Sequence, residues 1–405
     1  MRKLALAAAL STMAATMGLA HADDALTPSR TIKIGVLSDY ASQFSFYTGK
    51  YTLQAVNMAV EDFLAQKPGR KVQVVFADHQ NKPDVGSGIS RNWFDNEGVD
   101  IIADLPSSPV TLAVLPIATE RKKILLASST SNTMVTNELC NGMLAQWAYN
   151  SHTLNASVPA LLAQGGQSWF FVSWDNATGK DSESDATAMI QAGGGRVLGS
   201  VRHPLGVPDV SSYILQAQQS GAQVIAFANA GGDFVKSVKA SAEFGVMQKQ
   251  KLVGLIMSLP DVHGLGLQTA QGLYYADGFY WDRNEETRAF ARRFFAANGQ
   301  SKMPDNVAAA NYSATLHYLR AADAAGTVEA QAVMAKMRET RVDDFYSRGG
   351  QLREDGQMVH DVYLLQVKTP AESKEAWDYL RVIATVPGAQ AYAPLSESRC
   401  KLVRK

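Results

Sequence analysis

Five polar loops, each placed directly after a run of apolar residues, hold most of the side chains that could do chemistry. They combine serine and threonine hydroxyls, asparagine amides and aromatic rings. Hydroxyls and backbone amides at helix starts suit an anionic or polar group of a ligand, and aromatic rings suit a flat or apolar body. The alternative for any single serine or threonine is a cap on the helix that follows it. The five loops are residues 38–47, 106–109, 128–132, 173–179 and 229–233.

Three loop aspartates, Asp39, Asp175 and Asp233, could in principle serve as catalytic carboxylates. Closing a loop or contacting a ligand is the commoner use of such residues. Gly-x-Ser-x-Gly and Walker sequences are absent, and the glycines at 193–195 and 231–232 match no dinucleotide fingerprint. The sequence therefore favours a binding protein over an enzyme, with no cofactor.

The pattern of apolar residues predicts the strands and helices that position these loops. Short apolar strands alternate with helical patterns, and the alternation restarts near residue 169, which predicts two α/β units with parallel sheets wrapped by helices. Ligands of such sheets bind beyond the carboxyl ends of the strands, where the five loops lie. The expected strands are 32–37, 72–76, 100–105, 124–127, 169–172, 197–202, 224–228, 252–256 and 362–367. The main expected helices are 53–64, 185–192, 210–219, 234–244, 285–297 and 308–325.

The first 22 residues have the layout of a secretory signal peptide. Arg2 and Lys3 precede an apolar run, and the site Ala20-His21-Ala22 predicts cleavage before Asp23. No cysteine follows that site, so we expect no lipid anchor. Since 38 basic residues balance 38 acidic ones, nothing indicates a nucleic-acid partner. Cys140 and Cys400, in an oxidising compartment, are a disulfide candidate and not a metal site.

Several motifs, in their order along the chain, resemble the leucine/isoleucine/valine-binding family of periplasmic substrate-binding proteins of ABC transporters. The similar segments are Ile32–Leu37, Ala55–Asp62, Ala77–Pro83, Gly98–Ile102 with Ser107-Ser108, and Phe279–Asp282. Within that family the chain looks closest to a branch associated with aromatic and related carboxylates. The features that suggest this branch are Ala77–Lys82, Trp93–Asp95, Ser200–Leu205 and Gly278–Asp282.

The resemblance implies a type I periplasmic binding fold: two Rossmann-like lobes, each a parallel sheet flanked by helices, joined by a three-segment hinge. We expect lobe I at 30–147 plus 279–358, lobe II at 148–278 plus 359–390, and a C-terminal tail at 391–405 that a Cys140–Cys400 disulfide ties to lobe I. The chain should cross between the lobes near Trp147, Gly278 and Val359.

The implied function is that of a periplasmic, monomeric protein. It would capture a small carboxylate- or amide-bearing molecule, an aromatic acid or an amino-acid-like compound, and deliver it to an ABC permease of the inner membrane. A ligand-sensing receptor module of the same fold, feeding a signalling partner, is the alternative.

The family's binding site carries over to named positions. The ligand carboxylate would lie on the loops of Ser108 and Thr130, with an aromatic side chain near Phe46 or Tyr47. The family's second-lobe tyrosine falls at Thr178, and its ammonium-binding acid falls near Met257-Ser258, where no acid is present. These departures favour a ligand with an uncharged body, although Asp233 leaves a cationic ligand open. The candidate ligand contacts are Tyr40, Phe46, Tyr47, Ser107, Ser108, Ser129, Thr130, Ser131, Trp174, Asn176, Thr178, Asn229, Asp233 and Tyr280.

Overall fold

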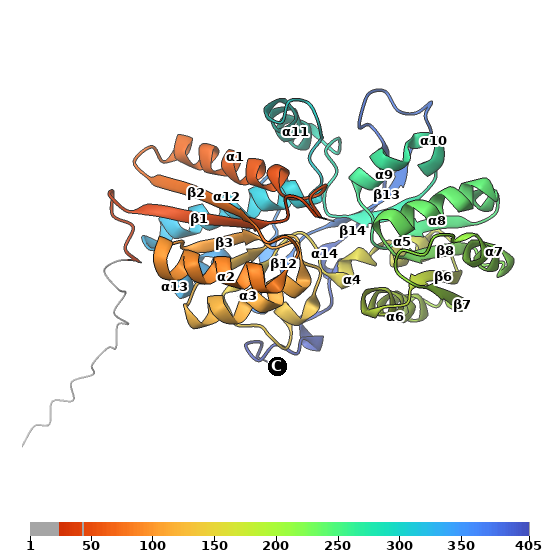
Figure 1. The fold of residues 1–405 in the computed structure, drawn as a ribbon, viewed down its shortest axis with the longest axis horizontal. Helices are drawn as coiled ribbons and strands as arrows, with labels where there is room; N and C mark the ends of the chain where they lie inside the picture. The colour runs from red at the N-terminus through yellow and green to blue at the C-terminus, as the bar shows by residue number, and fades with distance from the viewer. Residues whose placement is uncertain (1–23, 43, 405) are drawn as a thin grey trace, which may run out of the picture.

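The protein consists of two α/β lobes that lie side by side, as the computed structural model shows (Figure 1). The structure describes residues 24–42 and 44–404, so the expected signal peptide lies outside the described residues. Within the described part, no helix combines the length and the apolar character needed to cross a membrane.

Lobe I is built on a five-stranded parallel sheet with the order β2-β1-β3-β4-β5. The strands are short and apolar, and β3 and β4 are buried along their whole length, as expected of parallel strands covered on both faces. Their bounds are β1 (Thr31–Ser38), β2 (Lys71–Asp78), β3 (Ile101–Asp104), β4 (Ile124–Ala127) and β5 (Leu144–Gln146).

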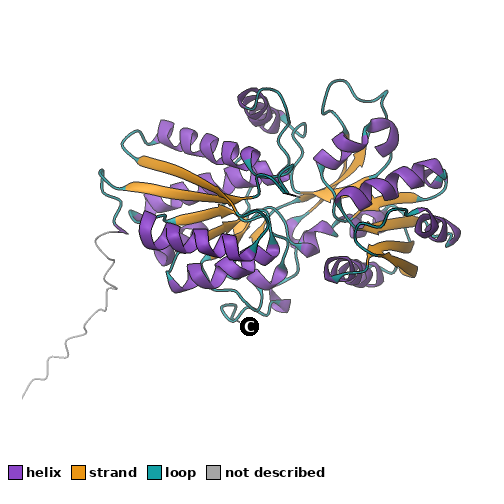
Figure 2. Cartoon of the chain, in the orientation of Figure 1, coloured by secondary structure: helices purple, strands orange, loops and turns teal. Residues whose placement is uncertain are grey.

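Helices cover both faces of this sheet (Figure 2). Alternate strand residues supply the two cores. Ile101 packs in one hydrophobic cluster with Phe63 of α1, whereas its neighbour Ile102 packs in another with Val110 and Val114 of α3. The helices of lobe I are α1 (Lys50–Gln66), α2 (Pro83–Asn92) with a following turn at Trp93–Glu97, α3 (Ser108–Glu120), α11 (Glu285–Ala297), α12 (Asn306–Ala325) and α13 (Ala330–Glu339). A short hairpin, β11 (Gln351–Leu352) and β12 (Met358–Val359), lies beside β5, where Gln357 bridges to Gln146.

Lobe II has a seven-stranded sheet with the order β14-β13-β10-β9-β8-β6-β7. The strands are β6 (Ser168–Trp174), β7 (Arg196–His203), β8 (Val224–Ala228), β9 (Lys251–Gly254), β10 (Tyr274–Asp277), β13 (Val362–Val367) and β14 (Leu380–Val386). The first five are parallel, but β13 is antiparallel to both β10 and β14. The expected wholly parallel sheet is therefore mixed at this edge, because the chain enters β13 directly from lobe I instead of through a crossover helix.

The helices of lobe II are α4 (Ser151–Leu154), α5 (Ser157–Ala163), α6 (Ala177–Ala192), α7 (Ser211–Gln219), α8 (Gly231–Glu243), α9 (Leu259–Leu265), α10 (Leu267–Ala270) and α14 (Gly388–Ala391). Short 3-10 turns occupy Thr133–Thr136 in lobe I, Val246–Gln248 in lobe II and Leu395–Glu397 near the C-terminus. Phe227 and Phe234 pack on one face of the lobe II sheet, and Trp169 and Phe171 pack on the other.

The chain passes between the two sheets three times: between β5 and α4, between β10 and α11, and between β12 and β13. This arrangement confirms the fold class expected from the sequence. The expected cysteine pair is also joined, with 5.5 Å between the Cα atoms of Cys140 and Cys400. The residue limits given above for the lobes stay a prediction.

Candidate functional site

A buried carboxylate, Asp104, joins the carboxyl ends of three strands in lobe I. It ends β3 and is wholly buried. The Ser38 hydroxyl at the end of β1 donates to Asp104 Oδ2 at 2.5 Å, and the Ser129 hydroxyl after β4 donates to Oδ1. Asn311 Nδ2 of α12 donates to the same Oδ1 at 3.2 Å. One side chain thus sets the relative positions of the polar loops.

Burial raises the pKa of Asp104 to about 6, against the lowering effect of the hydrogen bonds from Ser129 and Ser38. The backbone here is strained as well, since Asp104 and Leu105 have φ values of 82° and 61°. Non-glycine residues rarely adopt such angles, and they persist only where the surroundings impose them. The surrounding loops therefore hold the end of β3 in this strained backbone conformation.

Next to this carboxylate, two hydroxyls from different loops face each other. Ser108 Oγ, in the first turn of α3, lies 3.1 Å from Thr130 Oγ1 in the loop after β4. The N-terminus of a helix attracts anions through its free backbone N–H groups and its dipole. A carboxylate or amide can accept hydrogen bonds from such a pair and from the helix start.

The other predicted serines of lobe I hold the loops in place. Ser107 Oγ donates to Asn81 Oδ1 at 2.6 Å, and Ser129 is bound to Asp104. The backbone carbonyl of Ser131 accepts from Ser151 N at 2.9 Å and from Ser151 Oγ at 3.0 Å. The structure thus groups Ser107, Ser108, Ser129 and Thr130 at one edge of the sheet. The hydroxyls of Ser107 and Ser129 already donate to Asn81 and Asp104.

The loop after β1 is closed by Asp39. Burial tends to raise the pKa of this carboxyl, but hydrogen bonds from Ser42, Phe44 and Ala41 lower it below its ordinary value. The three backbone N–H groups donate at 2.7, 3.0 and 3.2 Å respectively. Asp39 is therefore a loop-closing acceptor, which was the commoner alternative to catalysis.

This loop carries the predicted aromatic contacts, and they point to different places. The Tyr40 ring packs against Phe76 of β2, with 5.5 Å between ring centroids. Phe46 is 45% exposed. Tyr47 reaches across to lobe II, where its hydroxyl donates to Asp261 Oδ1 at 2.7 Å. Lys302 is buried beneath the loop, donates to the Phe46 carbonyl at 2.8 Å and pairs with Asp305 at 2.6 Å.

Asp261 is the acid that sequence reasoning missed. It lies three residues after Ser258, in the first turn of α9, and its Oδ2 accepts from Ser258 N at 2.8 Å. Burial raises the pKa of Asp261, whereas the hydrogen bonds from Tyr47 and Ser258 lower it. The sequence Ser-Leu-Pro-Asp is a capping box, so this motif was the available signal. The position expected for an acid, Met257-Ser258, directly precedes this first turn of α9.

In lobe II, two of the predicted contacts bind each other. Asp233 Oδ2 accepts from Trp174 Nε1 at 2.8 Å and from Gly206 N at 2.7 Å, and its other oxygen pairs with Lys236 at 3.3 Å. Although burial opposes the change, these hydrogen bonds lower the pKa of Asp233. Its charge is therefore already compensated inside the lobe.

The remaining predicted residues of lobe II also make internal contacts or lie at the surface. Asn229 is wholly buried and donates to Ser237 Oγ at 3.1 Å, and Asn176 caps α6 by accepting from Gly179 N at 2.9 Å. Thr178 is exposed. Tyr280, in the second passage between the lobes, is buried, and its hydroxyl accepts from Leu380 N at 3.2 Å. A ligand-contact role for these four residues stays a prediction.

Within residues 24–42 and 44–404, no group of three or more histidine, cysteine, aspartate or glutamate side chains is arranged to hold a metal ion. Asp175 is exposed and pairs with Lys180 at 2.7 Å. The hydroxyls and amides of these loops are placed to make hydrogen bonds.

Comparison with known proteins agrees with this arrangement. The sequence model of a family described as periplasmic binding protein matches residues 31–375. The chain is 25% identical over 255 residues to the Leu/Ile/Val-binding protein homolog 6 of Brucella melitensis, an alignment that spans 61% of each protein.

Solved structures are similar over most of the chain. A branched chain amino acid ABC transporter periplasmic ligand-binding protein of Burkholderia xenovorans is 40% identical, with a TM-score of 0.88 over 92% of this chain and 99% of that one. A solute binding protein of an ABC transporter from R. palustris, in complex with benzoate, is 18% identical, with a TM-score of 0.75 over 92% of this chain and all of that one. At that identity the second likeness concerns the fold alone.

Proposed function

The chain belongs to the periplasmic binding protein family, and from this premise we propose that it captures a small carboxylate- or amide-bearing molecule between its two lobes. It would deliver the molecule to the permease of an ABC transporter. The ligand classes are aromatic acids, as in the R. palustris relative, and amino-acid-like compounds, as in the B. xenovorans relative.

The observation that carries the proposal is the pair of hydroxyls on Ser108 and Thr130, 3.1 Å apart at the start of α3. A carboxylate there would receive two charge-assisted hydrogen bonds from uncharged hydroxyls and the partial positive charge of the helix end. No arginine or lysine is needed, and the buried Asp104 holds the loop after β4 through Ser129.

The second half of the proposed site is the start of α9 in lobe II. Tyr47 and Asp261 make a direct hydrogen bond between the lobes, so this region is where the lobes come together. A ligand that touches both Ser108 and α9 would favour the closed arrangement, because a ligand shifts a conformational equilibrium only through its differential affinity for the two states.

Asp261 supplies a carboxylate with which the ammonium group of an amino-acid ligand could pair. Because Tyr47 and Ser258 already donate to this carboxylate, an amino-acid ligand would have to share or displace one of these donors. An aromatic acid would leave both in place and would pack its ring beside Tyr47. A panel that contains both classes discriminates between them.

A thermal-shift panel tests the proposal, with benzoate, 4-hydroxybenzoate, leucine, valine and their amides as probes. A true ligand at a hundredfold excess over its dissociation constant stabilises the folded protein by about 2.7 kcal/mol. We expect at least one acid to raise the melting temperature, and the Ser108→Ala/Thr130→Ala variant to lose the shift. Absence of a shift with every compound, or an unchanged shift in that variant, would contradict the proposal.

A further inference from the structure

The C-terminal segment connects the two lobes a fourth time. It leaves lobe II after β14, and Tyr392 is still packed in a cluster with Ala276 and Val386 of that lobe. The carbonyl of the next residue, Ala393, accepts from Arg353 Nη1 at 2.8 Å. Arg353 belongs to the hairpin of β11 and β12 in lobe I, so the chain crosses between Tyr392 and Ala393.

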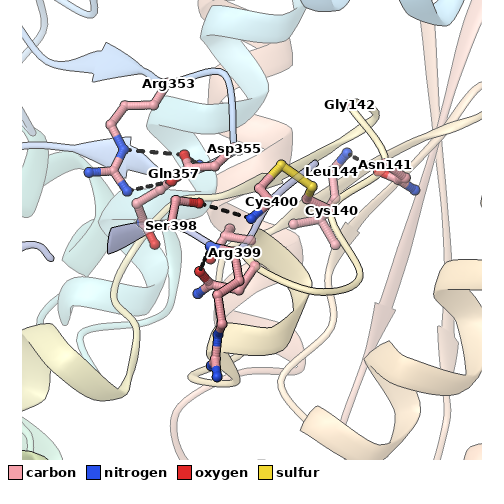
Figure 3. The surroundings of a disulfide bond; sticks show 12 residues. Cys140, Asn141, Gly142, Leu144, Arg353, Asp355, Gln357, Ser398, Arg399 and Cys400 are labelled. Carbon is pink, nitrogen blue, oxygen red and sulfur yellow. Dashed lines mark hydrogen bonds and ion pairs between the residues drawn. A yellow bond between two sulfur atoms is a disulfide. The ribbon is translucent and has the colours of Figure 1, made fainter. Parts of the chain in front are cut away.

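Beyond this crossing the segment is fixed to lobe I by a covalent bond. Cys400 and Cys140 are each 3% exposed and form the disulfide, which lies beside the hairpin (Figure 3). Around it, Arg399 N donates to Asn137 Oδ1 at 3.1 Å, and the Arg399 guanidinium pairs with Glu138 at 2.8 Å. We call residues 387–400 the C-terminal strap.

An ion pair within the hairpin orients Arg353, the lobe I residue that binds the strap. The two guanidinium nitrogens Nε and Nη2 of Arg353 donate to the two oxygens of Asp355, at 3.2 and 2.5 Å (Figure 3). Asp355 Oδ1 also accepts from Gln357 N at 3.0 Å. A bidentate arginine–carboxylate pair fixes orientation as well as distance, so the hairpin presents Arg353 to the strap in a set direction.

The strap runs beside the third passage between the lobes. Gly388 N donates to Asp361 Oδ1 at 3.0 Å, and the rings of His360 and Tyr392 are 5.6 Å apart. A Cβ atom on Gly388 would lie 2.9 Å from Val359 Cγ1 and 3.0 Å from the His360 carbonyl oxygen. The close approach therefore requires glycine at position 388.

A pocket of about 450 Å³ lies between the strap, the hairpin and the third passage. Its walls include Gln351 and Arg353 of the hairpin, His360 and Asp361 of the third passage, and Leu395 of the strap.

We propose that the C-terminal strap, closed by the Cys140–Cys400 bond, is a fourth hinge element that restricts how far the lobes open when no ligand is bound. A cross-link between distant residues removes conformations that the free chain would explore. With one end in the core of lobe II and the other bonded to lobe I, the strap opposes any rotation that draws Tyr392 away from Arg353. This inference concerns the ligand-free protein and is independent of the ligand proposed above.

Small-angle scattering of the ligand-free mature chain tests the proposal. The comparison is between the wild-type protein and the Cys140→Ser/Cys400→Ser variant, with hydrogen exchange measured on both. We expect the variant to have a larger radius of gyration and faster exchange at residues 359–361 and 388–396. Reduction of the folded wild-type protein by a phosphine, which leaves two thiols and the phosphine oxide, gives the same comparison if the variant does not fold.

A matched control separates the strap from general loss of stability. Val114→Ala removes two methyl groups from the buried core of lobe I and does not touch the strap, so it should lower the melting temperature and leave the radius of gyration unchanged. The proposal is overturned if breaking the disulfide speeds exchange only at residues 396–404 while the radius of gyration and the exchange of the third passage stay as in the wild type.

Discussion

The two lobes use similar polar residues at their strand ends in opposite ways. In lobe I, Asp104 is buried behind the loops and leaves the hydroxyls of Ser108 and Thr130 facing each other. In lobe II, Asp233 and Trp174 are bound to each other and to the loop at Gly206. On the proposed function, lobe I would carry a preformed half of the site, whereas lobe II would contribute mainly through the start of α9.

The largest expected effect distinguishes these two aspartates. Asp104→Ala leaves the Asn311 amide and two serine hydroxyls without their buried acceptor, which should lower the free energy of unfolding by about 2–4 kcal/mol and abolish ligand binding. Asp233→Ala should cost about 1–2 kcal/mol and preserve binding. Denaturant unfolding and calorimetry measure both. Loss of binding in Asp233→Ala with retention in Asp104→Ala would reverse the comparison.

Part of the pH dependence of stability should come from Asp104 in lobe I. Because burial raises the pKa of Asp104 to about 6, the folded protein keeps a proton that the unfolded chain loses near pH 4. Stability from this group should therefore be present at low pH and fall by up to about 2–3 kcal/mol as the pH rises from 4 to 6. Asp104→Asn should remove that part of the slope. Identical pH profiles for the variant and the wild type would contradict the assignment.

Much of the scaffold could be predicted, because buried parallel strands are short apolar runs. The strands at Val224–Ala228 and Val362–Val367 have the expected bounds. Strand β14 was missed because it lies at the edge of the sheet and only its end residues, Leu380 and Val386, are buried. The short strands β5 and β10 were missed as well.

Part of the candidate site could also be predicted from the sequence, and part could not. The polar loops of lobe I follow directly from the strand ends, so they could be read from the sequence. The pairing of Asp233 with Trp174 and Gly206 depends on contacts between segments 27 to 59 residues apart, for which the sequence has no local signal. Asp261 had such a signal in its capping box.

A smaller effect is expected at the hydroxyl pair itself. Ser108→Ala and Thr130→Ala should each weaken binding by about 1–3 kcal/mol, because each leaves a buried polar group of the ligand without a partner. The control outside the candidate ligand contacts is Asn284→Ala, which removes the cap of α11 and should cost about 1 kcal/mol of stability without changing affinity. If calorimetry finds the reverse pattern, the proposal of a preformed half-site in lobe I is wrong.

The smallest effect concerns the contact between the lobes. Tyr47→Phe removes one hydrogen bond to Asp261 and should weaken binding by about 0.5–1.5 kcal/mol. Tyr40→Phe is the matched control, since the buried Tyr40 hydroxyl has no hydrogen-bond partner among the described residues; its affinity should equal that of the wild type. Equal losses in the two variants would show that the Tyr47–Asp261 contact has no special part in binding.

The most direct test is a crystal structure of the protein with the acid or amide that gives the largest thermal shift. We predict that the ligand lies between the lobes, with its carboxylate or amide within hydrogen-bonding distance of Ser108 Oγ and Thr130 Oγ1. Its other end should lie beside Tyr47 and Asp261. Ligand density elsewhere, for example in the cavity beside the C-terminal strap, with the Ser108–Thr130 pair unoccupied, would contradict it.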